Sequence, residues 1–168
     1  YRSDSSTGAD KLDCRSNTEV SNVLLDLTQK VEDGWKLMVH FAPPCNTFSI
    51  ARSRSKATTL RSAEHPEGLS LTHQGTLDGN LIAFNTLWAA RYVAEVLCQA
   101  VSMENPQSSY MWKYLQPWIG AGHTDVKFSP CMFGGSFRKP TTVKCWNWMP
   151  KELDALCTTL GDKFTCGR

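Results

Sequence analysis

Residues 39–52 read VHFAPPCNTFSIAR: an apolar run ends in two prolines, a cysteine follows at once, and small polar residues lead to a basic cluster. Proline cannot continue a central strand, because it lacks the backbone N–H that a sheet ladder needs. The pattern is typical of a buried strand that stops at the prolines and delivers the thiol of Cys45 to the mouth of a sheet. We therefore interpret Cys45 as a candidate nucleophile and the rest of the chain as its support.

The segment before this strand is typical of a helix. Ser16 or Asn17 can cap it, and Gly34 follows as the glycine that commonly closes a helix. The apolar residues at helical spacing between them are Val20, Val23, Leu24, Leu27 and Val31. Residues 35–42 form a short and mostly apolar segment, as expected of a strand buried on both faces. A helix, a tight turn and a buried strand make half of a βαβ unit, which favours a parallel sheet.

A second helix and strand follow a long loop. Residues 46–80 show little periodicity, which predicts either a functional loop that folds over a substrate or an unstructured insertion. A helical pattern covers residues 81–97, and a short strand is predicted over residues 98–103. Glu104-Asn105-Pro106 comes directly after that strand, and the proline stops it. Since ligands bind at the carboxyl ends of parallel strands, we expect Cys45 and Glu104 to meet at one edge of the sheet.

The remaining chain adds smaller elements to the same domain. We predict a short helix at residues 109–115, strands at 124–128 and 139–146, a turn at 133–135 and a terminal helix at 151–160. The expected fold class is α/β, with a partial Rossmann-like sheet that is mostly parallel and has flanking helices. Residues 16–168 are expected to form one domain, and the polar residues 1–15 a loop or the frayed end of an upstream segment.

Composition places the chain among ordinary globular proteins. Of its 168 residues, 41% are hydrophobic and 20% are charged. No apolar run could span a membrane and no segment resembles a signal peptide, so we expect an intracellular protein that contacts no membrane. The seven cysteines include no CxxC pair, so no metal is expected. Two interpretations of them stay open, namely reduced thiols or the disulfide framework of a secreted protein.

Basic residues are grouped in two places. One group follows Cys45 and consists of Arg52, Arg54, Lys56 and Arg61; the other consists of Arg138, Lys139 and Lys144. The net charge of +2 identifies no partner. Two local basic groups are compatible with a phosphate-bearing substrate, and equally with an ordinary solvated surface.

Four segments together resemble a known family. Residues 43–52 look like the Pro-Cys nucleophile motif of cytosine carbon-5 DNA methyltransferases, and residues 104–106 look like their Glu-Asn motif on the next strand. Residues 61–69 and 131–139 are similar to segments of a divergent branch found in mobile elements. The resemblance covers about residues 20–150. It implies a single methyltransferase-like catalytic domain, nuclear in a eukaryote, that works as a monomer on DNA.

The mechanism implied by this resemblance fits the residues. The Cys45 thiolate would add to carbon 6 of a cytosine flipped out of the duplex, while Glu104 holds ring nitrogen 3 and the exocyclic amine. Carbon 5 would then take the methyl group of S-adenosylmethionine. The resemblance implies that the substrate is bound by Pro44, Asn46, Thr47, Ser49, Arg52, Asn105, Pro106, Arg138, Lys139 and Thr141. The resemblance also implies that Pro43 and Pro44 contact the cofactor.

Two departures from the family pattern leave other functions open. The family begins with a Phe-x-Gly-x-Gly loop that cradles the cofactor, and this sequence has none, which implies a fragment with an incomplete cofactor site. Phe137 stands where the family usually has Gln. One alternative is therefore a catalytically inactive methyltransferase-like module that binds nucleic acid. The second is a cysteine-rich binding domain unrelated to methyl transfer.

Overall fold

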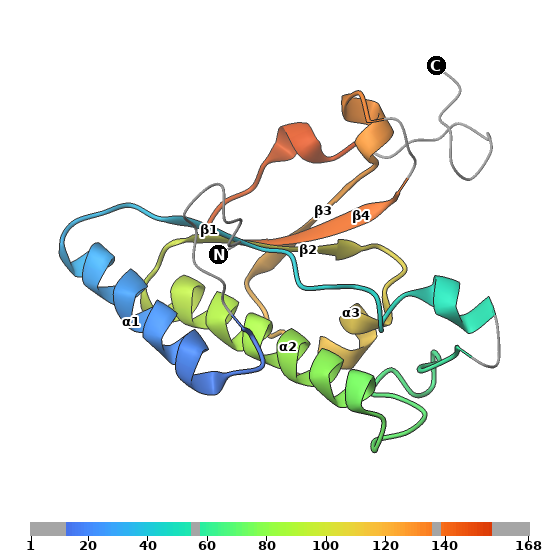
Figure 1. Cartoon of the computed structure of the whole chain (residues 1–168). Helices are drawn as coiled ribbons and strands as arrows, with labels where there is room; N and C mark the ends of the chain where they lie inside the picture. Colours follow the sequence, from blue (N-terminus) through green and yellow to red (C-terminus); the bar gives the residue numbers. More distant parts are fainter. Residues whose placement is uncertain (1–12, 55–57, 136–138, 156–168) are drawn as a thin grey trace, which may run out of the picture.

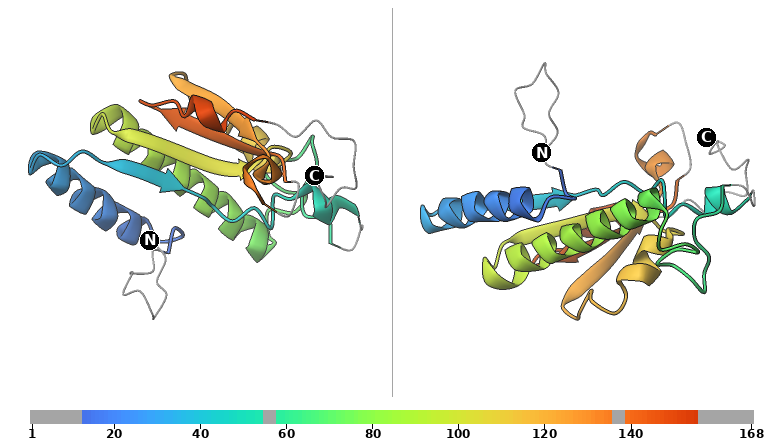
Figure 2. Two further views of the ribbon diagram at one scale, coloured as in Figure 1. Left: turned by 90° about the horizontal axis from the view of Figure 1, so that it is seen from above. Right: turned by 60° about the horizontal axis from the view of Figure 1, so that its bottom comes forward.

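The computed structural model describes residues 13–54, 58–135 and 139–155. A four-stranded sheet lies at its centre, in the order β1-β2-β4-β3 (Figure 1). Its strands are β1 (Met38–Phe41), β2 (Ala100–Pro106), β3 (His123–Phe128) and β4 (Thr141–Trp146). The helices α1 (Asn17–Glu32), α2 (Gln74–Arg91) and α3 (Tyr110–Leu115) cover one face of the sheet (Figures 1 and 2). The predicted α/β class is confirmed.

The sheet is mixed, so the prediction of a mostly parallel sheet is wrong. β1 pairs parallel with β2, but β4 lies antiparallel between β2 and β3. In its described part, the connection from β3 to β4 contains only the short 3₁₀ turn η3 (Pro130–Phe133). Parallel neighbours need a long crossover, usually a helix, whereas a direct connection of this kind joins antiparallel strands.

α1 confirms the first predicted helix. The Ser16 hydroxyl caps it by accepting the backbone N–H of Glu19 at 3.2 Å. Gly34, at φ +89°, ends the helix in the left-handed region that glycine adopts without strain. Val20 and Leu24, spaced by one helical turn, are buried in the core. The helix thus forms where the sequence pattern placed it, because its caps and its apolar stripe agree.

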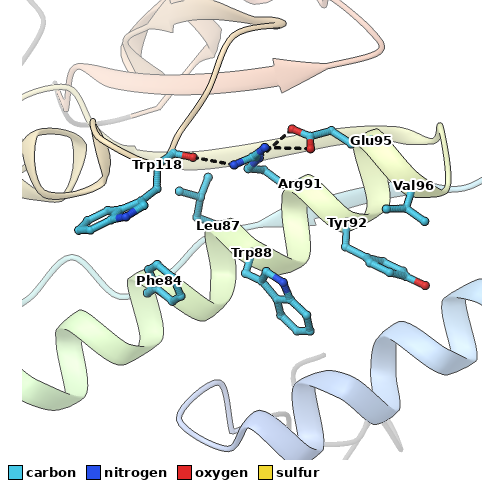
Figure 3. Close-up of a pocket in the computed structure, with 8 residues that line it drawn as sticks. All are labelled: Phe84, Leu87, Trp88, Arg91, Tyr92, Glu95, Val96 and Trp118. Carbon is cyan, nitrogen blue, oxygen red and sulfur yellow. Dashed lines mark hydrogen bonds and ion pairs between the residues drawn. The ribbon is translucent and has the colours of Figure 1, made fainter.

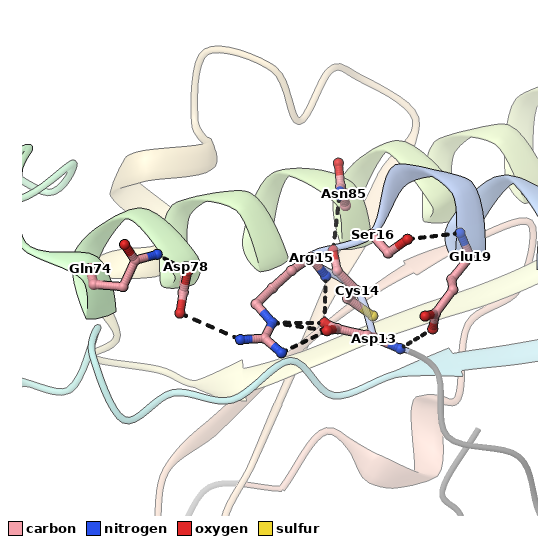
Figure 4. A network of polar contacts seen from close by, with 8 residues as sticks. All are labelled: Asp13, Cys14, Arg15, Ser16, Glu19, Gln74, Asp78 and Asn85. Atoms are coloured by element: carbon pink, nitrogen blue, oxygen red, sulfur yellow. Dashed lines mark hydrogen bonds and ion pairs between the residues drawn. The ribbon is translucent and has the colours of Figure 1, made fainter.

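Polar contacts tie the segment just before α1 to α2 (Figure 4). Asn85 Nδ2 on α2 donates to the Cys14 carbonyl at 2.9 Å. Arg15 forms ion pairs with Asp13 at 2.7 Å and Asp78 at 3.7 Å. Part of the predicted N-terminal loop therefore packs on the domain, and residues 1–12 lie outside the described part of the chain.

α2 begins at Gln74, not at Leu81 as predicted, so the loop after Cys45 is shorter than expected. Its N-cap is His73, whose Nδ1 accepts the backbone N–H of Thr76 at 3.3 Å. Glycines at positions 75 and 79 interrupt the apolar periodicity of the first turns and are poor helix formers. The apolar helical pattern in the sequence therefore begins only at Leu81, although the helix itself begins at Gln74.

The passage from α2 to β2 is unusually direct. α2 continues into one π-helical turn, η2 (Tyr92–Val96), and the strand begins at Ala100. Cys98 turns the chain between them with φ +52°, in the left-handed region that side chains other than glycine rarely adopt. This conformation removes the need for a longer linker.

β2 is longer than predicted and includes Glu104, Asn105 and Pro106. The ladder with β4 continues past the end of β1, with Glu104 opposite Val143 and Pro106 opposite Thr141. Of the terminal helix predicted over residues 151–160, the described part forms one turn, η4 (Lys151–Leu153), and residues 156–160 lie outside it.

The main core lies between the helices and the sheet. It includes Leu87 and Val93 from α2 and η2, Val101 and Met103 from β2, and Met111 from α3. A smaller cluster of Val126, Val143 and Cys145 lies on the opposite face of the sheet. Among the described residues, no helix is long and apolar enough to cross a membrane.

Replacing Cys98 by glycine is expected to stabilise the fold. The change relieves a left-handed conformation that costs an L-residue roughly 1–2 kcal/mol, partly offset by the entropy of glycine in the unfolded chain. The expected net gain is up to about 1 kcal/mol of unfolding free energy, measured by urea denaturation. Cys98→Ala keeps the strain and is the control; an equal gain in both variants would contradict this explanation.

Candidate active site

Cys45 follows the end of β1, and Glu104 lies in β2, the strand parallel to it, just beyond the stretch that the two strands share. Phe41, the last residue of β1, lies opposite Met103, so Glu104 is the first β2 residue beyond the paired stretch. Asn105 Nδ2 donates to the Pro43 carbonyl at 2.9 Å, and Asn105 is 1% exposed. This buried hydrogen bond ties the loop that carries Cys45 to the end of β2. Both side chains, Cys45 and Glu104, are half-buried, and Cys45 is a free thiol.

The loop after β1 forms a compact turn. The backbone N–H of Phe48 donates to the Cys45 carbonyl at 3.0 Å, and the Asn46 side chain accepts the N–H of Thr47 at 3.0 Å. Phe48 is 1% exposed, and its carbonyl accepts the N–H of Tyr110 at the start of α3, also at 3.0 Å. The turn is thus fixed at both ends, with Cys45 at its beginning.

Arg61 lies under this turn and is 1% exposed. Its guanidinium donates to the Thr47 carbonyl at 3.1 Å and to the Asn80 side chain at 2.7 Å. It also donates to the carbonyls of Pro66 at 2.7 Å and Thr76 at 3.1 Å, and lies 3.7 Å from the centre of the Phe48 ring. Burial lowers the pKa of Arg61 to about 10, which leaves it charged at neutral pH. Arg61 is therefore an internal clamp.

The role of Arg61 corrects one sequence-based prediction and was itself missed. Arg61 had been grouped with basic residues available to a phosphate, but all its donors face inward. Gly79 is the signal that could have revealed the clamp. A Cβ at this position would collide with the Thr47 hydroxyl and come within 3.0 Å of Arg61. A glycine within a helical pattern often marks such a close approach.

The other predicted substrate residues fall into distinct groups. Pro44 and Asn46 are exposed, and Thr47, Ser49 and Arg52 are half-buried on the same loop. The structure brings Pro106 and Thr141 together as partners across β2 and β4, and Lys139 is exposed just before them. Arg54 ends the turn η1 (Ile50–Arg54), and its side chain lies outside the description. Lys56, Phe137 and Arg138 lie outside the described residues.

Lys144 is also an internal residue and not part of a phosphate-binding surface. Its Nζ donates to Asp125 at 2.7 Å and lies 3.0 Å from His123 Nε2, on the helix side of the sheet. Burial, together with the neighbouring Lys144 ammonium, lowers the pKa of His123. Asp125 lies directly opposite Lys144 across β3 and β4, and His123 lies two residues before Asp125 on β3, opposite Trp146. This arrangement could be foreseen only once the strands were known to be antiparallel.

The described residues do not complete a site for S-adenosylmethionine. A groove of about 510 Å³ runs beside the predicted cofactor contacts Pro43 and Pro44. Its walls are mostly apolar side chains of α1, β1 and α2, and among the described residues Asp13 is the only carboxylate that lines it. A cofactor with a charged amino-acid end and ribose hydroxyls needs more polar partners than this. In the described part of the chain, no cluster of three or more His, Cys, Asp or Glu side chains could hold a metal ion.

A second cavity, of about 320 Å³, lies on the outer side of α2 and η2 (Figure 3). Phe84, Trp88 and Trp118 line it, and Arg91 bridges Glu95 and the Trp118 carbonyl. It involves the later turns of α2, whereas the Cys45 loop contacts the first turns near Gly79. This cavity is therefore separate from the candidate active site.

Replacing Arg61 by leucine is expected to destabilise the domain strongly. Hydrogen bonds from a charged donor are worth about 1.5–3 kcal/mol each, and the loss would leave several buried acceptors unpaired. We expect a loss of about 3 kcal/mol or more of unfolding free energy in urea denaturation. The control is Arg91→Leu, which removes an exposed i,i+4 pair with Glu95 and should cost less than about 1 kcal/mol. Similar losses for the two variants would contradict the clamp.

Comparisons of the chain with protein-family models, with curated proteins and with solved structures find no significant match. The likeness to cytosine carbon-5 methyltransferases therefore rests on the four sequence segments described above. What the structure adds is the spatial relation of Cys45, Glu104 and Asn105. The function is inferred from that geometry and from the chemistry of these side chains.

Proposed function

We propose that this chain carries the base-attacking half of a DNA cytosine carbon-5 methyltransferase, with Cys45 as nucleophile and Glu104 as its partner. The observation that carries the proposal is the buried hydrogen bond from Asn105 to the Pro43 carbonyl. It holds the turn that begins at Cys45 against the strand that presents Glu104. A thiol and a carboxyl group at one sheet edge are the two groups that addition to a cytosine ring requires.

The proposed steps use only this chain's own residues. The Cys45 thiolate forms a bond to carbon 6 of cytosine, and the electron pair of the 5,6 double bond moves toward carbon 5. Glu104 holds ring nitrogen 3 and the exocyclic amine, and so stabilises the charge that develops in the ring. Reversal breaks the sulfur–carbon bond and restores the thiolate. In the family that the motifs resemble, S-adenosylmethionine supplies the methyl group to carbon 5 of this adduct.

The substrate is proposed to be a cytosine turned out of duplex DNA. Carbon 6 is inaccessible inside the base stack, so the base must leave the helix. We assign the phosphate contacts to the half-buried Arg52 on the Cys45 loop and to the exposed Lys139 before β4. Arg61 and Lys144 are buried inside the domain. The proposed contact with DNA therefore uses fewer basic residues than the two groups found in the sequence.

Exchange of the cytosine carbon-5 hydrogen tests this half-reaction without a methyl donor. After thiolate addition, carbon 5 takes a proton from water; loss of its original hydrogen and release of the thiolate then return cytosine. An oligonucleotide tritiated at carbon 5 should therefore release tritium into water. Cys45→Ser should abolish the release, and Glu104→Gln should slow it by about 10²-fold or more, as expected for loss of a positioned acid–base group.

Cys98→Ser is the matched control, since Cys98 is an exposed thiol at the start of β2, remote from its carboxyl end. It should release tritium at the rate of the unaltered protein. Absence of release by the unaltered protein would overturn the proposal. Equal release by Cys45→Ser would do the same, because the chemistry would then not use this thiol.

A further inference from the structure

The exposed residues of α2 recur at a regular spacing. They follow one another at alternating steps of three and four, and they are Gln74, Leu77, Leu81, Phe84 and Trp88. All other residues of this helix are buried or half-buried. The four apolar residues of the set are between 39% and 46% exposed. α2 is therefore apolar toward the core and apolar on its exposed side as well.

Alternating steps of three and four are the spacing of a coiled-coil seam. Side chains at this spacing form one narrow stripe along a helix, and such a stripe packs against the stripe of another helix. We call Leu77, Leu81, Phe84 and Trp88 the α2 seam. α1 and α3 both contact α2, but they leave the seam exposed. Within the described part of the chain, the seam thus has no helix packed over it.

The charge of this surface favours a neutral partner. The α2 seam contains no ionisable side chain, and Arg91 and Glu95, which continue its spacing, neutralise each other in an ion pair at 2.7 Å. A strongly charged partner such as DNA would find no complementary charge here. A second copy of the same surface would meet no like charge.

Two copies of the α2 seam are also complementary in size when their helices run antiparallel. With the two-fold axis between Leu81 and Phe84, each Leu81 lies opposite Phe84 of the second copy, and each Leu77 lies opposite Trp88 of the second copy. Every contact then joins a smaller side chain to a larger one, which allows the two surfaces to interdigitate. Leu77 of the second copy meets the cavity of about 320 Å³ that Trp88 lines (Figure 3).

We propose that this chain forms a two-fold symmetric dimer through the α2 seam, with the two α2 helices antiparallel. The rings of Phe84, Trp88 and Trp118 leave roughly 200–300 Å² uncovered in each copy. With the leucines and the flanking side chains, two copies bury about 1,000 Å², the lower limit for a specific interface. The dimer replaces the monomer that the methyltransferase resemblance implies, and it does not depend on Cys45 or Glu104.

Sedimentation equilibrium of the full chain tests the dimer without any measurement of activity. We expect a monomer–dimer equilibrium with a dissociation constant of roughly 1–100 μM, as suits a small interface. Leu81→Lys and Phe84→Glu should each weaken it by more than about tenfold, because an unpaired charge would be buried. Leu25→Lys, at an exposed leucine of α1 outside the seam, is the control and should leave it unchanged. An unaltered protein that is monomeric at about 0.5 mM would overturn the proposal.

A mixture of the two seam variants tests the antiparallel arrangement. In a mixed dimer, Lys at position 81 of one copy faces Glu at position 84 of the other, and the second contact keeps its natural Leu81 and Phe84. The mixture should therefore associate more than about tenfold more tightly than either variant alone. Parallel helices would place each position opposite itself, so a mixture without recovery would contradict the arrangement. If either variant fails to fold, the sedimentation of the unaltered protein and of Leu25→Lys still decides whether the dimer exists.

Discussion

The buried guanidinium of Arg61 joins the parts of the molecule on which the proposed site depends. It connects the turn after Cys45 with the loop around Pro66 and with the first turns of α2, through neutral acceptors on all three. A buried charge is tolerated only when its hydrogen-bond donors are satisfied. Loss of some of the acceptors around the Arg61 guanidinium would therefore strongly destabilise the folded state. The clamp therefore imposes one position on the Cys45 loop, and Gly79 provides the space for it.

The sheet supplies the second constraint. β1 and β2 run parallel and present the Cys45 loop and Glu104 at the same edge, while β4 continues the ladder along Glu104, Asn105 and Pro106. Pairing with β4 holds Glu104 within a strand instead of in a free loop. The amide of Asn105 then reaches the Pro43 carbonyl and connects the two halves of the site. A rigid edge of this kind suits a reaction in which a base is attacked and held at once.

The sequence allowed the prediction of α1, of a strand before Cys45 and of the adjacent Glu104 strand, because their caps, glycines and apolar patterns are local signals. The prediction that the strand before Cys45 is buried on both faces is wrong: β1 lies at the edge of the described sheet, and its residues alternate between exposed and half-buried. It could not reveal the antiparallel direction of β4, which depends on long-range pairing. The early start of α2 at an unusual His73 cap was hidden by its glycines. Arg61 and Lys144 were taken for surface cations, since burial of a charge depends on partners distant in the chain. Apart from the start of α2, the features that the sequence did not reveal depend on non-local pairing.

Covalent capture of Cys45 by a modified base tests the central claim most directly. In 2-pyrimidinone the exocyclic amine of cytosine is missing, so carbon 6 is more electrophilic; the thiolate adds there while carbon 5 takes a proton from water. After incubation with an oligonucleotide containing this base, intact-mass and peptide analysis should find one adduct, on Cys45. No adduct, or an adduct on Cys14 or Cys98 in its place, would contradict the assignment of Cys45 as the nucleophile.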